Sequence, residues 1–344
     1  MRKTKEQKGI TLIALIITII VLLILAVVAI GAVQNDGIIN HAKNAREEYG
    51  KAGVNENTII EEYFSKIEQN APGPFSDIDA KDYGASIEYS VDLNNDGNKT
   101  NDWKVFYKDD QYLYIIASDY ILNTNLPTGF KMSGRGGQYG VYCATVEEDF
   151  ISTSAKDINQ DKVRKYKLSW LSEYSASTYG NARATADFLN VDVWTEKFGN
   201  EEKGIEAIGS PTLEMWVASW NAKGYTPVYT KYVKIGYSTG ITTEIVDGDK
   251  ADLKESEGFS DTLYFPHGND EGWAKDNVCN GYWLASPGYT NAGGNTMMYV
   301  HYQGNLNSYY IRVAPATVLA MRPLVSIPKN LITLDENGNL KVAE

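Results

Sequence analysis

Residues 297–328 read MMYVHYQGNLNSYYIRVAPATVLAMRPLVSIP, and they follow an aromatic run, GYWLASP, at residues 281–287. Aromatic and β-branched residues favour strands, and Pro287-Gly288 and Gln303-Gly304 are typical turn pairs. We therefore expect an aromatic strand followed by a hairpin. The run MRPLVSI near the end is almost wholly apolar, which predicts a buried strand. We expect this part of the chain to belong to a globular α+β domain, which we call the head.

Further strands and helices are predicted upstream of this stretch. Strand patterns occur in IEYSV, WKVFY and QYLYIIASDYI, with Asp109-Asp110 as a hairpin turn, and again between residues 225 and 264. Helices are expected over 182–198 and 212–223, the second with Pro211 in its first turn. The head then covers residues 81–330, after a linker at 71–80. Residues 331–344 form a C-terminal hairpin or tail.

The N-terminal part of the chain has a different composition. Residues 10–33 read ITLIALIITIIVLLILAVVAIGAV and carry no charge, and a stretch of about 20 apolar residues is long enough to cross a bilayer as a helix. Four basic residues precede it, which predicts a cytoplasmic N-terminus and an extracellular head. Apolar residues continue at helical spacing over 34–70, which predicts a helical stalk. The expected fold class is thus α+β, with a long transmembrane and stalk helix before the head.

The first residues resemble the type IV prepilin N-terminus. A basic leader, residues 1–9, ends in Lys8-Gly9 and is followed by the apolar run that begins Ile10-Thr11-Leu12. The resemblance implies cleavage between Gly9 and Ile10 by a prepilin peptidase, methylation of the new N-terminus, and other pilin subunits as partners. The chain has Ala14 where the family usually has Glu, which puts filament assembly in doubt. An uncleaved signal anchor is the alternative.

Charge and cysteine content limit the partners. The net charge of -12 makes nucleic acid an unsuitable partner. The two cysteines, Cys143 and Cys279, are not at metal-binding spacing. Outside the cytoplasm they would form a disulfide or remain as two free thiols, and the sequence leaves both open. No catalytic residues are predicted, because the three histidines lack metal-type or nucleophile partners and no G-x-S-x-G or P-loop motif is present.

One loop in the head has the pattern of a calcium site. The segment VDLNNDGNKTNDW places acidic and amide side chains at alternate positions around Gly97. The candidate Ca2+ ligands are Asp92, Asn94, Asp96, Asn98 and Asp102. Trp103 stands where an EF-hand has its bidentate Glu, so Asp102 would have to substitute. A metal-free Asn/Asp/Gly turn is the alternative.

Two sequence segments together resemble C-type-lectin-like domains of the formylglycine-generating-enzyme type. The first is Gly209-Ser-Pro-Thr-Leu-Glu-Met-Trp216, and the second is GYWLASP followed by Met321-Arg-Pro-Leu-Val-Ser326. Surface proteins of Firmicutes that carry prepilin leaders show a similar combination. The resemblance covers about 75–328 and implies that the segment before the R-P strand, residues 297–313, is an exposed binding face.

That segment interleaves Tyr, Asn and Ser, a composition typical of binding surfaces. The predicted ligand-binding residues are Tyr299, His301, Tyr302, Asn305, Asn307, Tyr309, Tyr310 and Arg312. Strand-filling aromatics beside a polar turn are the alternative. The sequence thus predicts a membrane-anchored, pilin-like surface protein with an adhesin-type domain for a carbohydrate or protein ligand. The other interpretation is a structural minor pilin or pseudopilin of a pilus, secretion or competence system.

Overall fold

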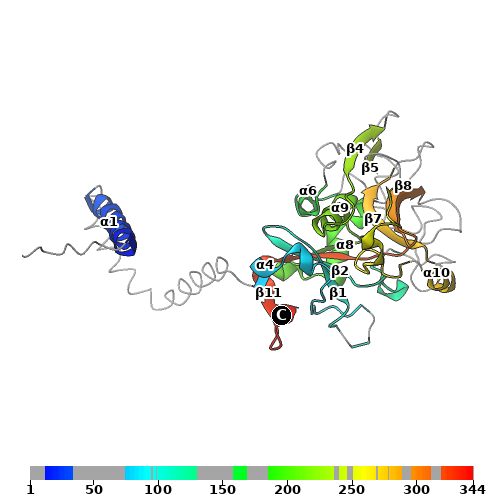
Figure 1. Ribbon diagram of the computed structural model, residues 1–344, viewed down its shortest axis with the longest axis horizontal. Coiled ribbons are helices and arrows are strands. Elements are labelled where there is room, and N and C mark those ends of the chain that lie inside the picture. Colours follow the sequence, from blue (N-terminus) through cyan, green and yellow to red (C-terminus); the bar gives the residue numbers. More distant parts are fainter. Residues whose placement is uncertain are drawn as a thin grey trace, which may run out of the picture. The chain divides into compact units, whose positions relative to one another are not determined.

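The computed structural model (Figure 1) describes residues 12–33, 74–93, 96–97, 99–128, 130, 158–168, 185–235, 240–245, 251–268, 270–277, 279–288, 296–310 and 319–343. Two units are distinguished, Met1–Asn70 and Ala71–Glu344. The predicted cleavage site, Gly9 and Ile10, and the predicted stalk at 34–70 lie outside the described residues.

The first unit contains helix α1, Leu12–Val33. Side chains are described for residues 15–28, and the large apolar ones among them are 47–70% exposed. Across the described residues, no helix satisfies the length and hydropathy of a membrane span. The predicted fold class is therefore wrong on this point: over the described ranges the structure is α+β, with mostly short helices and a strand-rich body, and it contains no helix of the predicted transmembrane type.

The second unit is built around two four-stranded sheets. The first has the order β1-β2-β10-β3, with β1 Trp103–Lys108, β2 Tyr112–Ala117, β10 Leu324–Pro328 and β3 Glu206–Ile208. All three pairings are antiparallel, with Val325 opposite both Ile115 and Ala207. The predicted turn after β1 and the predicted buried strand MRPLVSI are confirmed. The strand MRPLVSI lies at the centre of the sheet, where both faces are covered.

The second sheet has the order β6-β9-β8-β7. Its strands are β6 Ala251–Asp252, β9 Asn305–Tyr310, β8 Thr296–His301 and β7 Gly281–Pro287. The predicted aromatic strand is β7, and every residue of it is buried. The predicted hairpin is β8–β9, in which Met298 is opposite Ser308 and Val300 is opposite Leu306.

Two smaller antiparallel pairs complete the strands. One is β4 Thr230–Ile235 with β5 Gly240–Ile245, and the other is β11 Ile332–Leu334 with β12 Leu340–Val342. The β11–β12 pair is the predicted C-terminal hairpin. The predicted strand IEYSV, residues 87–91, makes one isolated bridge, from Glu88 to Lys341, and Ser86 just before it bridges to Lys104. It is therefore a connection between the first sheet and the C-terminal hairpin rather than a strand of its own.

The helices of the second unit are short. Among the described residues they include α4 Pro74–Asp77, α6 Gln160–Val163, α8 Val191–Phe198, α9 Leu213–Ala222 and α10 Glu271–Asn277, with 3-10 turns at Ala80–Asp82, Asn123–Asn125, Arg164–Tyr166, Glu201–Lys203, Glu257–Ser260 and Lys329–Leu331. The predicted helix 212–223 is α9. Thr212 caps it by accepting a hydrogen bond from the Met215 amide, so Pro211 precedes the cap. The predicted helix 182–198 is interrupted at Asn190, which caps α8.

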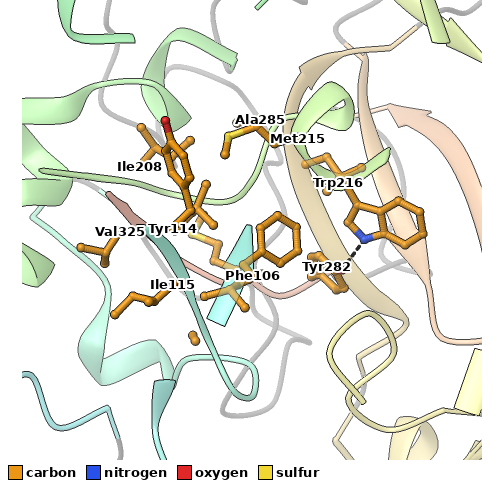
Figure 2. Packing of buried hydrophobic residues seen from close by; sticks show 14 of the residues in the cluster. Phe106, Tyr114, Ile115, Ile208, Met215, Trp216, Tyr282, Ala285 and Val325 are labelled. Atoms are coloured by element: carbon orange, nitrogen blue, oxygen red, sulfur yellow. Dashed lines mark hydrogen bonds between the residues drawn. The ribbon is translucent and has the colours of Figure 1, made fainter. Parts of the chain in front are cut away.

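The segments that carry the lectin-like resemblance contact one another in the core. The Trp216 indole on α9 donates to the Tyr282 hydroxyl on β7 at 2.8 Å, which Figure 2 shows as a dashed line. The Leu213 amide donates to Ser286 Oγ at 2.9 Å, and the Ala285 amide donates to the Pro211 carbonyl at 2.9 Å. These buried bonds fix α9 against β7.

Arg322 connects this junction to the first sheet. Its side chain is fully buried, and its Nε and Nη2 donate to the Ala117 carbonyl at 3.1 and 2.8 Å. Nη1 donates to the Leu263 carbonyl at 2.7 Å, and the guanidinium carbon lies 4.9 Å from the centre of the Tyr282 ring. Backbone carbonyls thus solvate the buried charge, and one side chain contacts β2, β7 and the segment before α10.

Candidate functional site

The β8–β9 hairpin has buried apolar side chains along its strands and polar side chains near its tip. Met297, Met298, Val300 and Leu306 are buried, so β8 is covered on both faces. His301, Tyr302, Asn305 and Asn307 are partly exposed. A strand that is anchored by so much buried apolar surface can present neighbouring polar groups in fixed positions.

The tip of the hairpin is held by hydrogen bonds on both sides. The Tyr302 amide donates to the Asn280 carbonyl at 3.0 Å, and the Gln303 amide donates to Nδ1 of His301 at 3.2 Å. Gly304 has φ +88, and a Cβ there would lie 3.0 Å from the Lys254 nitrogen, so the turn needs glycine for both reasons. The rings of His301 and Tyr302 lie 4.6 Å apart between centroids. The tip therefore offers two neighbouring rings on a constrained backbone.

The predicted ligand-binding residues do not all share this position. Tyr299 is only 7% exposed and packs edge-on against Trp283 at 6.3 Å, so it supports the hairpin from within. His301, Tyr302, Asn305 and Asn307 lie at or near the tip. The side chains of Tyr309 and Tyr310, and the whole of Arg312, lie outside what the structure describes.

Burial affects the chemistry of His301. Its side chain is partly enclosed, and burial lowers the pKa of the imidazole below its ordinary value. The neutral ring accepts the Gln303 amide hydrogen bond through Nδ1, which a protonated ring could not do. A neutral His301 is thus part of the structure of the tip.

Helix α10 lies beside the tip and was not predicted from the sequence. Gln303 Nε2 donates to Glu271 Oε1 on α10 at 3.4 Å. Two residues along the helix, the indole of Trp273 stacks flat on the imidazole of His267, with centroids 3.4 Å apart and planes 12° apart. The candidate functional site, which we call the tip surface, comprises His301, Tyr302, Gln303, Asn305, Asn307, Glu271, Trp273 and His267.

The predicted calcium loop is only partly described. The Asp92 carboxylate accepts the Gly97 amide at 2.8 Å, and the buried Asp102 carboxylate accepts the Leu93 amide at 2.7 Å. These two carboxylates therefore organise the loop backbone. Asp96 is described, whereas Asn94 and Asn98 are not. Within the described ranges, no group of three or more His, Cys, Asp or Glu side chains is placed to hold a metal ion. Calcium binding by this loop remains a prediction.

Only one of the two cysteines of the predicted disulfide, Cys279, lies within the described residues. Cys279 is buried, and its thiol donates to the Gly281 carbonyl at 3.3 Å. Burial raises the pKa of this thiol to about 12, so it is protonated at neutral pH and is a poor nucleophile. Cys143 lies outside the described residues.

No protein-family model, no curated protein and no solved structure matches the chain. The prepilin-like and lectin-like resemblances therefore remain predictions from the sequence.

Proposed function

We propose that this chain is a pilin-like, membrane-attached protein of the cell surface, whose body, residues 71–344, recognises a ligand through the tip surface. The observation that carries the proposal is the tip of the β8–β9 hairpin. It presents the adjacent rings of His301 and Tyr302 on a backbone that is held by hydrogen bonds to Asn280 and within the turn. Rigid aromatic groups beside adaptable amides make good contacts at low entropic cost.

Helix α1 supports membrane attachment. Its described apolar side chains are largely exposed, from Leu15 to Val28, and so much apolar surface is unfavourable in water. Lipid would remove that cost. The basic leader and the uncharged run after it support an extracellular body and processing by a prepilin peptidase.

An array of glycans and proteins tests the recognition role. The full chain, kept in solution with a mild detergent, is probed beside Tyr302→Ala and Asn305→Ala variants. The matched control is Asn337→Ala, which alters an exposed amide in the turn of the other hairpin, β11–β12. We expect the two tip variants to lose binding to whichever array members the wild type binds, and the control to retain it. Binding that survives both tip substitutions would exclude the tip surface.

A structural role in a filament is the second candidate, and α1 is the observation that favours it. The same exposed apolar side chains could pack against α1 of sister subunits. Shearing cells and examining the released material separates the candidates. Filaments that contain this chain, together with an array that shows no bound ligand, would favour the structural role.

A further inference from the structure

Asp119 and His267 form a hydrogen-bonded pair beside α10, although they are 148 positions apart in the sequence. His267 Nε2 lies 2.7 Å from Asp119 Oδ1. The imidazole is stacked on Trp273, and the buried Tyr120 ring is edge-on to both, with centroids 5.1 and 5.4 Å away. The pair is thus packed against aromatic rings from the same two segments, Tyr120 beside Asp119 and Trp273 six residues after His267.

Two hydrogen-bond acceptors of the pair have no donor among the described residues. Asp119 Oδ1 accepts the Tyr120 amide at 2.6 Å as well as His267 Nε2. When Nε2 of a neutral imidazole donates to a carboxylate, Nδ1 is a lone-pair acceptor. In the part of the chain that the structure describes, neither Asp119 Oδ2 nor His267 Nδ1 receives a hydrogen bond. The Asp119 side chain is 44% exposed and that of His267 is 16% exposed, so a ligand can reach them.

The charges around the pair favour a positively charged ligand. Asp270 and Glu271 lie at the start of α10, next to His267 in the chain. Two of the neighbouring cations are engaged elsewhere: Arg322 is buried on backbone carbonyls, and Lys104 Nζ donates to Thr262 Oγ1 at 2.8 Å. Lys275, on α10, is exposed to solvent. An anionic ligand would be repelled by the carboxylates of Asp119, Asp270 and Glu271, whereas a ligand that carries only donors and a positive charge would complement both acceptors.

We propose that Asp119 and His267 bind the ammonium or guanidinium group of a lysine or arginine side chain on a partner protein. This inference rests on the proposed function, because it names the chemistry of the ligand that the tip surface recognises. The cation donates to Asp119 Oδ2 and His267 Nδ1, and its charge compensates the carboxylate as water is displaced. A neutral saccharide diol would satisfy the same acceptors but would leave that charge uncompensated.

Short peptides test this assignment directly. The full chain in detergent is titrated with acetylated, amidated tripeptides that carry one central lysine, arginine, norleucine or citrulline, and binding is followed by ligand-observed NMR. We expect the lysine and arginine peptides to bind and their uncharged counterparts to bind at least tenfold more weakly. Asp119→Asn and His267→Gln should each weaken binding of the charged peptides at least tenfold. The matched control is Asp276→Asn, which removes an exposed charge from the same helix and should change the affinity less than threefold.

Three results would overturn the assignment. One is equal binding of lysine and norleucine peptides, and another is an equal loss of affinity in Asp119→Asn and Asp276→Asn, which would reduce the effect to general electrostatics. The third is Asp119-dependent binding of a neutral saccharide from the array. Thermal unfolding of each variant separates lost binding from lost folding. If binding of the array ligand depends on Tyr302 but not on Asp119, this inference fails and the proposed function stands. If binding of the charged peptides depends on Asp119 but the array finds no ligand, this inference stands and the proposed function fails.

Discussion

The β1–β2 and β8–β9 hairpins have strands of equal length and differ at their tips. At the first tip, Asp109 Oδ1 accepts the amides of Gln111 and Tyr112, and Oδ2 accepts the Tyr114 hydroxyl at 2.7 Å. At the second, a side chain within the turn accepts one hydrogen bond among the described residues, from the Gln303 amide to His301 Nδ1, and the side chains of Tyr302 and Asn305 are partly exposed. Polar groups that are satisfied internally stabilise a turn, whereas groups that remain accessible can serve recognition.

The buried junction between the two sheets should be the most sensitive part of the body. Arg322→Met would keep the side-chain volume but leave the carbonyls of Ala117 and Leu263 without their donors. Each buried unsatisfied group costs about 1–3 kcal/mol, so we expect a loss of roughly 4 kcal/mol in the free energy of unfolding. Urea unfolding measures it. A loss below about 1 kcal/mol would show that the two sheets are held together without this side chain.

The attachment of β7 to β8 gives the next largest effect. Gly281 has φ +134, and a Cβ there would lie only 1.9 Å from the Val300 carbonyl oxygen. Gly281→Ala should therefore destabilise the body by roughly 3 kcal/mol, because backbone strain and a clash act together. Gly338→Ala is the matched control, since Gly338 also has positive φ but has nothing within 4 Å. Equal losses in the two variants would mean that φ alone matters and that β8 can shift away from β7.

We call the tip of the β1–β2 hairpin the closed tip, because its polar groups bond to one another, and that of the β8–β9 hairpin the open tip. Removing one hydroxyl oxygen should destabilise the closed tip. Tyr114 is fully buried, and its hydroxyl donates to Asp109 Oδ2 and lies 3.0 Å from the Lys165 carbonyl. Burial, together with the Asp109 carboxylate, raises the pKa of Tyr114 well above its usual value, so the hydroxyl remains a donor. Tyr114→Phe should cost about 2 kcal/mol, because it leaves a charged acceptor short of one bond. Tyr302→Phe, at the open tip, should change stability by less than about 0.5 kcal/mol. Similar losses in the two variants would remove the distinction between the tips.

The sequence predicts the strands and turns of both hairpins because local signals determine them. Asp109-Asp110 and Gln303-Gly304 lie between strand-forming runs, and α9 begins at a capping Thr212. The burial of Tyr299 could not be predicted from alternation. An alternating pattern of apolar and polar residues predicts burial only for a strand with one face in water. Strand β8 is an inner strand of its sheet, and its side chains are buried on both faces.

The rest of the site depends on contacts between distant residues. Helix α10 is seven residues long, too short for a helical period to stand out. The pairing of Asp119 with His267 joins two segments that carry no shared motif. A signal was present in the cluster of His267, Asp270 and Trp273, three chemically distinctive residues within seven positions, but only the fold shows that His267 bonds to Asp119 while its ring stacks on Trp273.

The smallest expected effect is a pH dependence at the open tip. Burial lowers the pKa of His301, so the unfolded chain binds a proton more readily than the folded one. Stability should therefore fall as pH drops below about 6.5, the ordinary value for histidine, and the fall should end once the folded state also protonates. His301→Asn should abolish that decline while changing stability at pH 8 by less than about 1 kcal/mol, since an amide oxygen can accept the Gln303 amide. Urea unfolding of both proteins between pH 5 and pH 8 gives the comparison. If the variant loses stability in acid as steeply as the wild type, the decline comes from groups outside the tip, and the neutral imidazole is not what holds the open turn in its folded form.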